Sequence, residues 1–198
     1  MRPSIRSLAL VLGLVVPTLG HAATWEVDPV HSTVGFAIRH MMISTVRGHF
    51  RTFTATATGD PAAPTAATIV ATIDATTIDT ANEKRDTHLK TADFLDVEKF
   101  PTIVFMSKKI ESAGQGKVKV TGDLTLHGVT KQVVVDVEGP TPTIKDPMGN
   151  TKAGAHATAR INRKDFGIVW NKAMDGGGIM LGEEIDISID IEAVKKSD

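Results

Sequence analysis

Residues 184–192 read EIDISIDIE, so that every second residue is isoleucine and the residues between are polar. Residues 117–127, KVKVTGDLTLH, alternate in the same way, with Val and Leu as the apolar set. Because successive side chains of a β-strand point to opposite faces, this period of two predicts strands with one apolar and one polar face. Such strands are typical of an antiparallel sheet that is dry on one side and wet on the other. The question for function is whether the dry side is packed solid or encloses space.

The rest of the chain predicts an all-β fold with one helical insertion. The period changes between residues 81 and 97, where Asn82 is a suitable N-cap for a short helix. About eight antiparallel strands favour an eight-stranded closed barrel, because closure removes unpaired strand edges, and a sandwich of two sheets is the alternative. The further strand-like runs are 24–27, 33–39, 46–58, 68–74, 101–109, 132–138 and 152–162, with a loop at 140–149 and an irregular or short helical segment at 163–175.

The first 22 residues have the pattern of a secretory signal peptide. Arg2 and Arg6 precede an apolar run at residues 8–16 that is too short to span a bilayer, and Gly20 and Ala22 suit signal peptidase. We therefore expect cleavage after Ala22 and a single domain at 23–198. An exported chain without cysteine has no disulfides, which fits the bacterial periplasm.

The charge of the chain argues against several classes of partner. Loss of two arginines with the signal leaves 20 basic and 23 acidic residues, a net charge of −3, which gives no attraction to nucleic acid. No second apolar segment is long enough to cross a membrane as a helix once the signal is removed. The sequence leaves the oligomeric state open, a homodimer included.

The strand at 152–162 predicts a cavity inside the barrel. Its apolar face carries four alanines, at 153, 155, 157 and 159, followed by Ile161. Alanine is a weak strand former, and the unfilled volume it leaves in a core costs stability, about 24 cal/mol per Å³. Four small residues in succession therefore indicate either large residues opposite or room for a ligand.

Catalytic and metal-binding patterns are missing from the sequence. None of the six histidines after the signal has a zinc-type spacing with another, and Ser32 lacks the setting of a nucleophile elbow. We expect no catalytic residue, no metal ligand and no cofactor. A haem- or metal-using redox module and a filled-barrel structural or interaction domain remain the alternatives. Arg39, Arg85, His88 and Arg163 could meet a polar ligand head at a cavity mouth, although surface salt bridges are the simpler role for each.

Several segments together resemble the bacterial YceI-like family, the polyisoprenoid-binding periplasmic proteins. The most specific is residues 122–131, GDLTLHGVTK, and Leu95 and Phe100 depart from the common pattern, in which aromatic and Tyr residues respectively are frequent. The other matching segments are WEVDPVHS at 25–32, FAIRH at 36–40, VRGHF at 46–50, RDTHL at 85–89, DF at 93–94, FP at 100–101, Phe105 and RKDFG at 163–167.

The resemblance implies a lipocalin-like antiparallel barrel with a long apolar pocket and without catalytic residues. The function expected is that of a periplasmic carrier for a long isoprenoid or isoprenoid-quinone-like lipid, held by inward apolar side chains. The residues expected to bind this ligand are Phe36, Ile38, Phe50, Phe53, Phe94, Phe105, Leu124, Leu126, Ala155, Ala157, Ile187 and Ile189.

Overall fold

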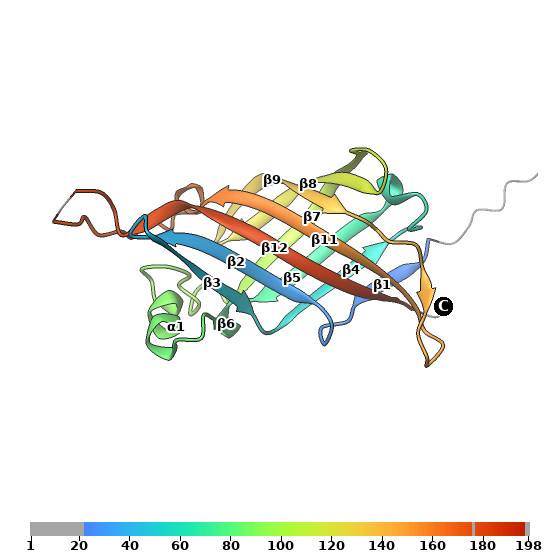
Figure 1. Cartoon of the computed structure of the whole chain (residues 1–198), viewed down its shortest axis with the longest axis horizontal. Coiled ribbons are helices and arrows are strands. Elements are labelled where there is room, and N and C mark those ends of the chain that lie inside the picture. The colour runs from blue at the N-terminus through green and yellow to red at the C-terminus, as the bar shows by residue number, and fades with distance from the viewer. Residues whose placement is uncertain (1–21, 176, 197–198) are drawn as a thin grey trace, which may run out of the picture.

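The structure is a computed structural model that describes residues 22–175 and 177–196, and it is built almost wholly of β-strands (Figure 1). Apart from Ala22, the predicted signal peptide lies outside the described residues. One α-helix, α1 (Glu83–Lys90), and three short 3₁₀ helices at Pro64–Ala66, Ala75–Thr77 and Arg163–Phe166 accompany the strands. The strands are β1 (Thr24–Val27), β2 (Thr33–His40), β3 (Ser44–Phe50), β4 (Phe53–Thr58), β5 (Thr68–Asp74), β6 (Ile78–Asp79), β7 (Thr102–Ser112), β8 (Lys117–Leu126), β9 (Val129–Glu138), β10 (Ile144–Lys145), β11 (Thr151–Asn162) and β12 (Leu181–Lys195).

The sheet closes on itself as an eight-stranded antiparallel barrel, as the sequence predicts. Its ring order is β11-β9-β8-β7-β5-β4-β1-β12, and β12 completes the ring by pairing with β11. Strands β1 and β2 lie one after the other along β12, and β3 and β4 lie one after the other beside them. Each of these two pairs fills one position of the barrel, so eight positions hold ten strands, while β6 and β10 are short additions.

The predicted strand at 46–58 is interrupted, which corrects the sequence interpretation. The segment after β5 inserts at Arg51 and Thr52, where Thr77 O accepts from Arg51 N (3.3 Å) and Thr52 O accepts from Asp74 N (3.0 Å). The chain therefore changes partner there, from β6 beside β3 to β5 beside β4. The loop predicted at 140–149 likewise contains the short strand β10.

The predicted N-cap of the helix is confirmed. Asn82 caps α1 by accepting a hydrogen bond from Arg85 N (3.0 Å). Strands β8 and β9 form a hairpin around His127 and Gly128, which both have positive φ, as tight hairpin turns require.

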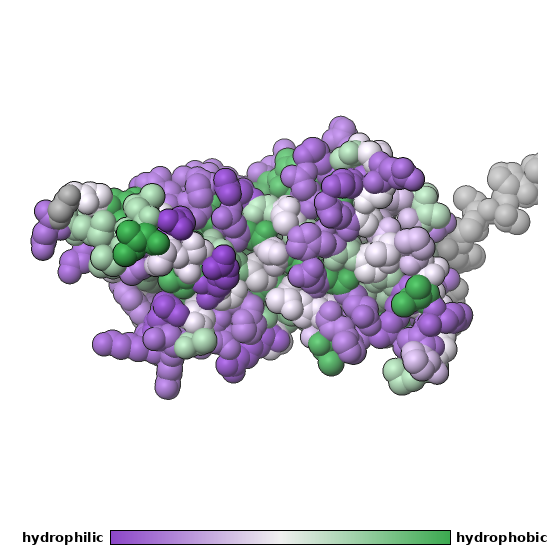
Figure 2. All heavy atoms as spheres, in the orientation of Figure 1, coloured by the Kyte–Doolittle hydropathy of each residue, from purple (hydrophilic) through white to green (hydrophobic). Residues whose placement is uncertain are grey.

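The barrel is polar outside and apolar inside. Cross-strand ion pairs such as Lys117–Glu138 and Arg160–Asp186 lie on the outer face, and Figure 2 shows polar residues covering much of the side in view. Fully buried apolar side chains form two separate clusters. The larger lies at the α1 end and includes Phe94 and Phe166, and the smaller is Ile110, Val118 and Val120. No helix among the described residues is long and apolar enough to cross a membrane.

The ring of Phe105 on β7 lies against Gly122 on β8. A Cβ added at Gly122 would be 2.5 Å from Phe105 Cζ and 2.5 Å from the backbone oxygen of Met106, closer than atoms pack. Any larger residue at this position must therefore displace the ring, the strand, or both.

We predict that Gly122→Ala destabilises the protein by about 1–3 kcal/mol, because overpacking of this size forces a shift of backbone and ring. Gly154→Ala on β11 is the matched control, since its nearest atom would be at an ordinary 3.4 Å. Denaturant unfolding of both variants measures the effect, and equal stability of the two would contradict the packing described.

Candidate functional site

A cavity of about 420 Å³ lies inside the barrel, within the range that ligand pockets commonly occupy. Its wall is almost entirely apolar and draws on strands all round the ring. At one end it reaches Leu89, Phe94 and Leu95, at or after the end of α1, and at the other it reaches the loop prolines Pro61, Pro64 and Pro140. A barrel filled by its own side chains, which the sequence left as an alternative, would not contain a cavity of this size.

All twelve residues that the sequence singles out for ligand binding lie in the cavity wall. They come from seven strands and from the segment that follows α1. The structure thus brings together side chains that are up to 153 positions apart in the sequence, from Phe36 to Ile189. Their contact with a ligand stays a prediction.

The alanine stripe of β11 forms one side of the cavity. The β11–β12 register pairs Ala155 with Ile191, Ala157 with Ile189 and Ala159 with Ile187. All of these side chains belong to the cavity wall. Each alanine methyl group therefore lies beside an isoleucine. The volume that a larger side chain would have filled at the alanine positions stays empty.

The inward isoleucines of β12 keep accessible surface although they point into the barrel. Ile185, Ile187, Ile189 and Ile191 are only half-buried, whereas inward residues of a close-packed core are fully buried. Because these four residues line the cavity, this accessible surface is what the cavity exposes. Apolar surface left in this way is available for a ligand to cover.

Aromatic rings fill part of the interior without closing it. Phe36 and Phe50 pack with ring centroids 5.8 Å apart, and Phe105 covers Gly122. Near the α1 end, Phe94 stacks with Trp170 at 5.1 Å. Because Phe94 lies in the cavity wall and in the larger packed cluster, the interior is more tightly packed towards α1.

Sequence reasoning missed the contribution of β9. Its inward residues Val133, Val135 and Val137 all line the cavity. These three valines do alternate along the strand. The apolar Val134 lies between two of them, so the sequence does not show a clear alternation of apolar and polar residues there. Val134 is exposed on the outer face of the barrel.

Of the four polar candidates, only Arg163 reaches the cavity wall. Arg39 is on the surface, where Nη2 donates to Met42 O (2.7 Å). The guanidinium of Arg85 binds Thr80, and His88 pairs with Asp93. A salt bridge was the simpler expectation for Arg163, and the structure contradicts it: the side chain is 1 % exposed and pairs with no carboxylate of the described residues.

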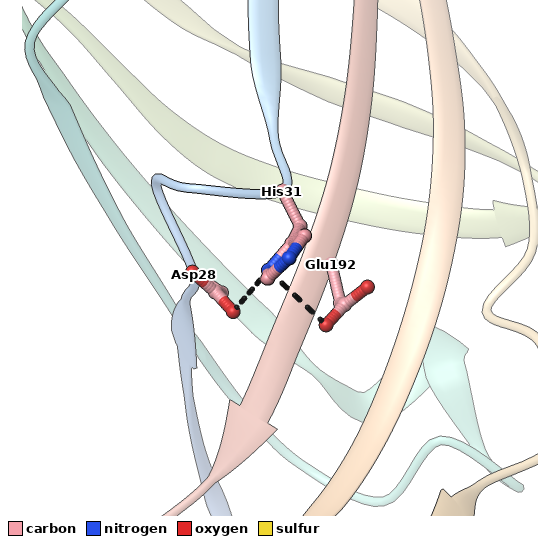
Figure 3. A group of neighbouring side chains, drawn as sticks. All are labelled: Asp28, His31 and Glu192. Carbon is pink, nitrogen blue, oxygen red and sulfur yellow. Dashed lines mark hydrogen bonds and ion pairs between the residues drawn. The ribbon is translucent and has the colours of Figure 1, made fainter. Parts of the chain in front are cut away.

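A second cluster of titratable side chains lies outside the cavity, where β1 turns into β2 beside β12. Figure 3 shows His31 between Asp28 and Glu192, and their ligand atoms lie within 4.8 Å of one another. Nδ1 of His31 donates to Asp28 Oδ2 (2.9 Å), the local hydrogen bonding expected of a turn histidine. Within the described part of the chain, this group has the composition of a metal site.

The ammonium group of Lys152 already pairs with both carboxylates of this cluster. Its Nζ donates to Glu192 Oε1 (2.6 Å) and to Asp28 Oδ2 (3.3 Å), and lies 3.7 Å from Asp146 Oδ2. The hydrogen bond to Glu192 raises the pKa of Lys152. A divalent cation would have to displace this ammonium group. The cluster is therefore better suited to holding the start of β11 against β12 than to binding a metal.

The chain is similar to known proteins in both sequence and fold. The family model of the YceI-like domain matches residues 25–193. A UPF0312 protein of Vibrio cholerae is 31% identical over 198 residues, covering 99% of this chain and 100% of its own. The solved YceI protein of Campylobacter jejuni is 33% identical with a TM-score of 0.69, covering 81% of this chain and 91% of its own. A polyisoprenoid-binding domain from Saccharophagus degradans has a TM-score of 0.62 at 13% identity, covering 89% and 100%, which shows likeness of fold alone.

We predict that Asp28 makes the protein more sensitive to acid. The hydrogen bond from His31 lowers the pKa of Asp28 from its usual 3.8 to about 2. A carboxyl group whose pKa is lower in the folded than in the unfolded protein stabilises the fold fully at a pH above its unfolded pKa. This stabilisation is lost as the pH falls towards the folded pKa. Between pH 3.8 and about 2, the free energy of unfolding should therefore fall less steeply in Asp28→Asn than in the wild type. If the free energy of unfolding fell equally steeply with acid pH in the two proteins, this role of Asp28 would be contradicted.

We predict that Ala157→Leu fills the cavity rather than overpacking a core. In ligand-free protein its stability should hold or rise, while binding of an apolar chain falls. In a packed interior the same change would typically cost about 1–3 kcal/mol. Thermal melts of delipidated protein with a chain-binding titration measure both quantities. Lower stability with unchanged binding would show that no usable space lies beside Ala157.

Proposed function

The chain belongs to the YceI-like family, and from this premise we propose that it binds a long apolar lipid inside its barrel. The observation that carries the proposal is the cavity of about 420 Å³ with an almost wholly apolar wall. Such a wall offers hydrophobic contact along its length and few hydrogen bonds, which suits a hydrocarbon chain and excludes a sugar or a nucleotide.

The free energy of binding would come from removing the chain from water. Burial contributes about 0.8 kcal/mol for each methylene group. The cost of ordering a flexible ligand opposes it, so only part of this sum appears as affinity. Length therefore matters, and β12, with 15 residues at about 3.3 Å each, gives the barrel an interior long enough for an extended chain.

An isoprenoid is the chain we favour. The Saccharophagus domain of similar fold is described as polyisoprenoid-binding. Because this chain shares that fold, we propose the same class of ligand for it. The rings of Phe36, Phe50 and Phe105 in the wall give an irregular interior that suits methyl-branched units. An isoprenoid or isoprenoid-quinone-like amphiphile is accordingly the proposed ligand.

The protein would act as a carrier or store rather than as an enzyme. The twelve proposed contact residues are all apolar, and none of them supplies a nucleophile, an acid or a base. The rival function, a haem- or metal-using redox module, has its best site at Asp28, His31 and Glu192, where Lys152 competes with any cation. The signal-like residues 1–22 support a periplasmic location for the carrier.

We predict that protein purified from the periplasmic fraction carries a lipid. Native mass spectrometry should give a mature chain starting at Ala23 with an added mass, and organic extraction should remove that mass and yield an isoprenoid. Ala157→Leu, prepared in the same way, should carry less lipid because the cavity is smaller.

Three outcomes would contradict this function. Bare protein in every preparation would oppose lipid binding, and a retained Met1 on cytoplasmic protein would oppose export. Stoichiometric metal or haem in place of lipid would favour the redox alternative.

A further inference from the structure

Arg163 stands at the end of the inward stripe of β11. The inward positions of this strand are 153, 155, 157, 159 and 161, and 163 is the next in the same series. The side chain is 1 % exposed and belongs to the cavity wall. It lies beside Phe166 and Ile168, which are fully buried in the larger packed cluster near α1. The apolar inward stripe of β11 is thus followed by a buried guanidinium group.

Only two of the three guanidinium nitrogens have partners among the described residues. Nε donates to Gly182 O (2.9 Å) and Nη1 donates to Ile168 O (2.7 Å). Nη2 is buried and has no hydrogen-bond partner in the part of the chain that the structure describes. Burial lowers the pKa of Arg163, and the opposing carboxylate, Glu183, is already paired with Lys164 Nζ. The local charges of Lys164, Glu183 and Arg163 therefore sum to one positive charge.

An unsatisfied buried donor on a charged group is costly, and proteins keep such groups when something else pairs with them. Hydrogen bonds from arginine to a carboxylate or phosphate oxygen are among the strongest that proteins form. A ligand that brought an anionic oxygen to Nη2 would satisfy the donor and balance the charge in one contact.

We propose that Arg163 binds the polar end of the lipid through Nη2, and that this end is a small anionic oxygen group such as a carboxylate. The head lies near α1, and the chain runs back along Ala159, Ala157 and Ala155 towards the loop prolines. This inference rests on the proposed lipid-binding function. It narrows the ligand to a chain with an anionic head in place of a neutral quinone, and it gives the chain an orientation in the barrel.

Three ligands of equal chain length separate the headgroup from the chain: palmitate, methyl palmitate and hexadecane. Each is titrated against delipidated wild-type protein by displacement of a fluorescent apolar probe. We expect palmitate to bind roughly tenfold or more tightly than hexadecane, the effect of one charge-assisted hydrogen bond, with the ester between them. Arg163→Gln should reduce palmitate binding to the hexadecane level and leave hexadecane unchanged.

Arg160→Gln is the matched control, because Arg160 is exposed on the outer face of β11 and pairs with Asp186 there. It should alter neither affinity. A second measurement uses only wild-type protein and so stands even if Arg163→Gln fails to fold. In palmitate labelled with ¹³C at the carboxyl carbon, the bound carboxyl should titrate at a lower pH than the same group in detergent micelles.

The outcomes distinguish this inference from the function beneath it. Equal affinity for palmitate and hexadecane, or a bound carboxyl that titrates as it does in micelles, would overturn the role of Arg163 while leaving the apolar cavity as a lipid site. Failure of the fluorescent apolar probe and of all three chains to bind would overturn the lipid-binding function itself, and the headgroup site with it, whereas failure of palmitate alone would overturn only the headgroup site.

Discussion

The pairing of β11 with β12 is the constraint on which the rest of the structure depends. Residues 152–162 lie opposite 184–194 without a register shift, and this ladder closes the ring. The same register decides what faces inward, because a slip by one residue would turn every side chain to the other face. Closure therefore places a stripe of alanines beside a stripe of isoleucines, and the interior stays open along both. The sides of the cavity thus follow from the strand pairing, while loop residues such as Pro61 and Pro140 line one of its ends.

A barrel with an incompletely filled interior needs stabilising contacts elsewhere, and these lie at its ends and on its outside. Packed apolar clusters lie on either side of the open region, the larger of them near α1. On the outer face, Lys152 joins β11 to Glu192 of β12 and to Asp28 in the turn after β1. This contact holds the start of the closing ladder where β1 pairs with only three residues of β12. Only the outer contacts are separate from the proposed ligand site, since Phe94, Leu124 and Leu126 belong both to the larger cluster and to the cavity wall.

The period of two in residues 117–127 and 184–192 was sufficient to predict an antiparallel sheet and its inward face, because alternation fixes the side of each residue once one face is dry. Closure into a barrel was inferred from the number of strands, which left a sandwich as the alternative. The four alanines of β11 likewise predicted the cavity, since the small volume of alanine is known from the sequence alone. The break at Arg51 and Thr52 was not predictable, because it depends on a segment more than 20 residues away. The burial of Arg163 was also missed, since its two carbonyl partners, Gly182 and Ile168, meet it only in the closed fold.

The proposed function requires that the barrel interior receives an apolar chain. Crystals grown with a long-chain lipid that carries a terminal bromine test it most directly, because anomalous scattering locates the bromine without reference to the protein. We expect one strong bromine peak inside the barrel, among the side chains of β11, β12 and β7 that line the cavity. A peak on the outer surface, or an interior without any peak under conditions in which the lipid binds in solution, would contradict it.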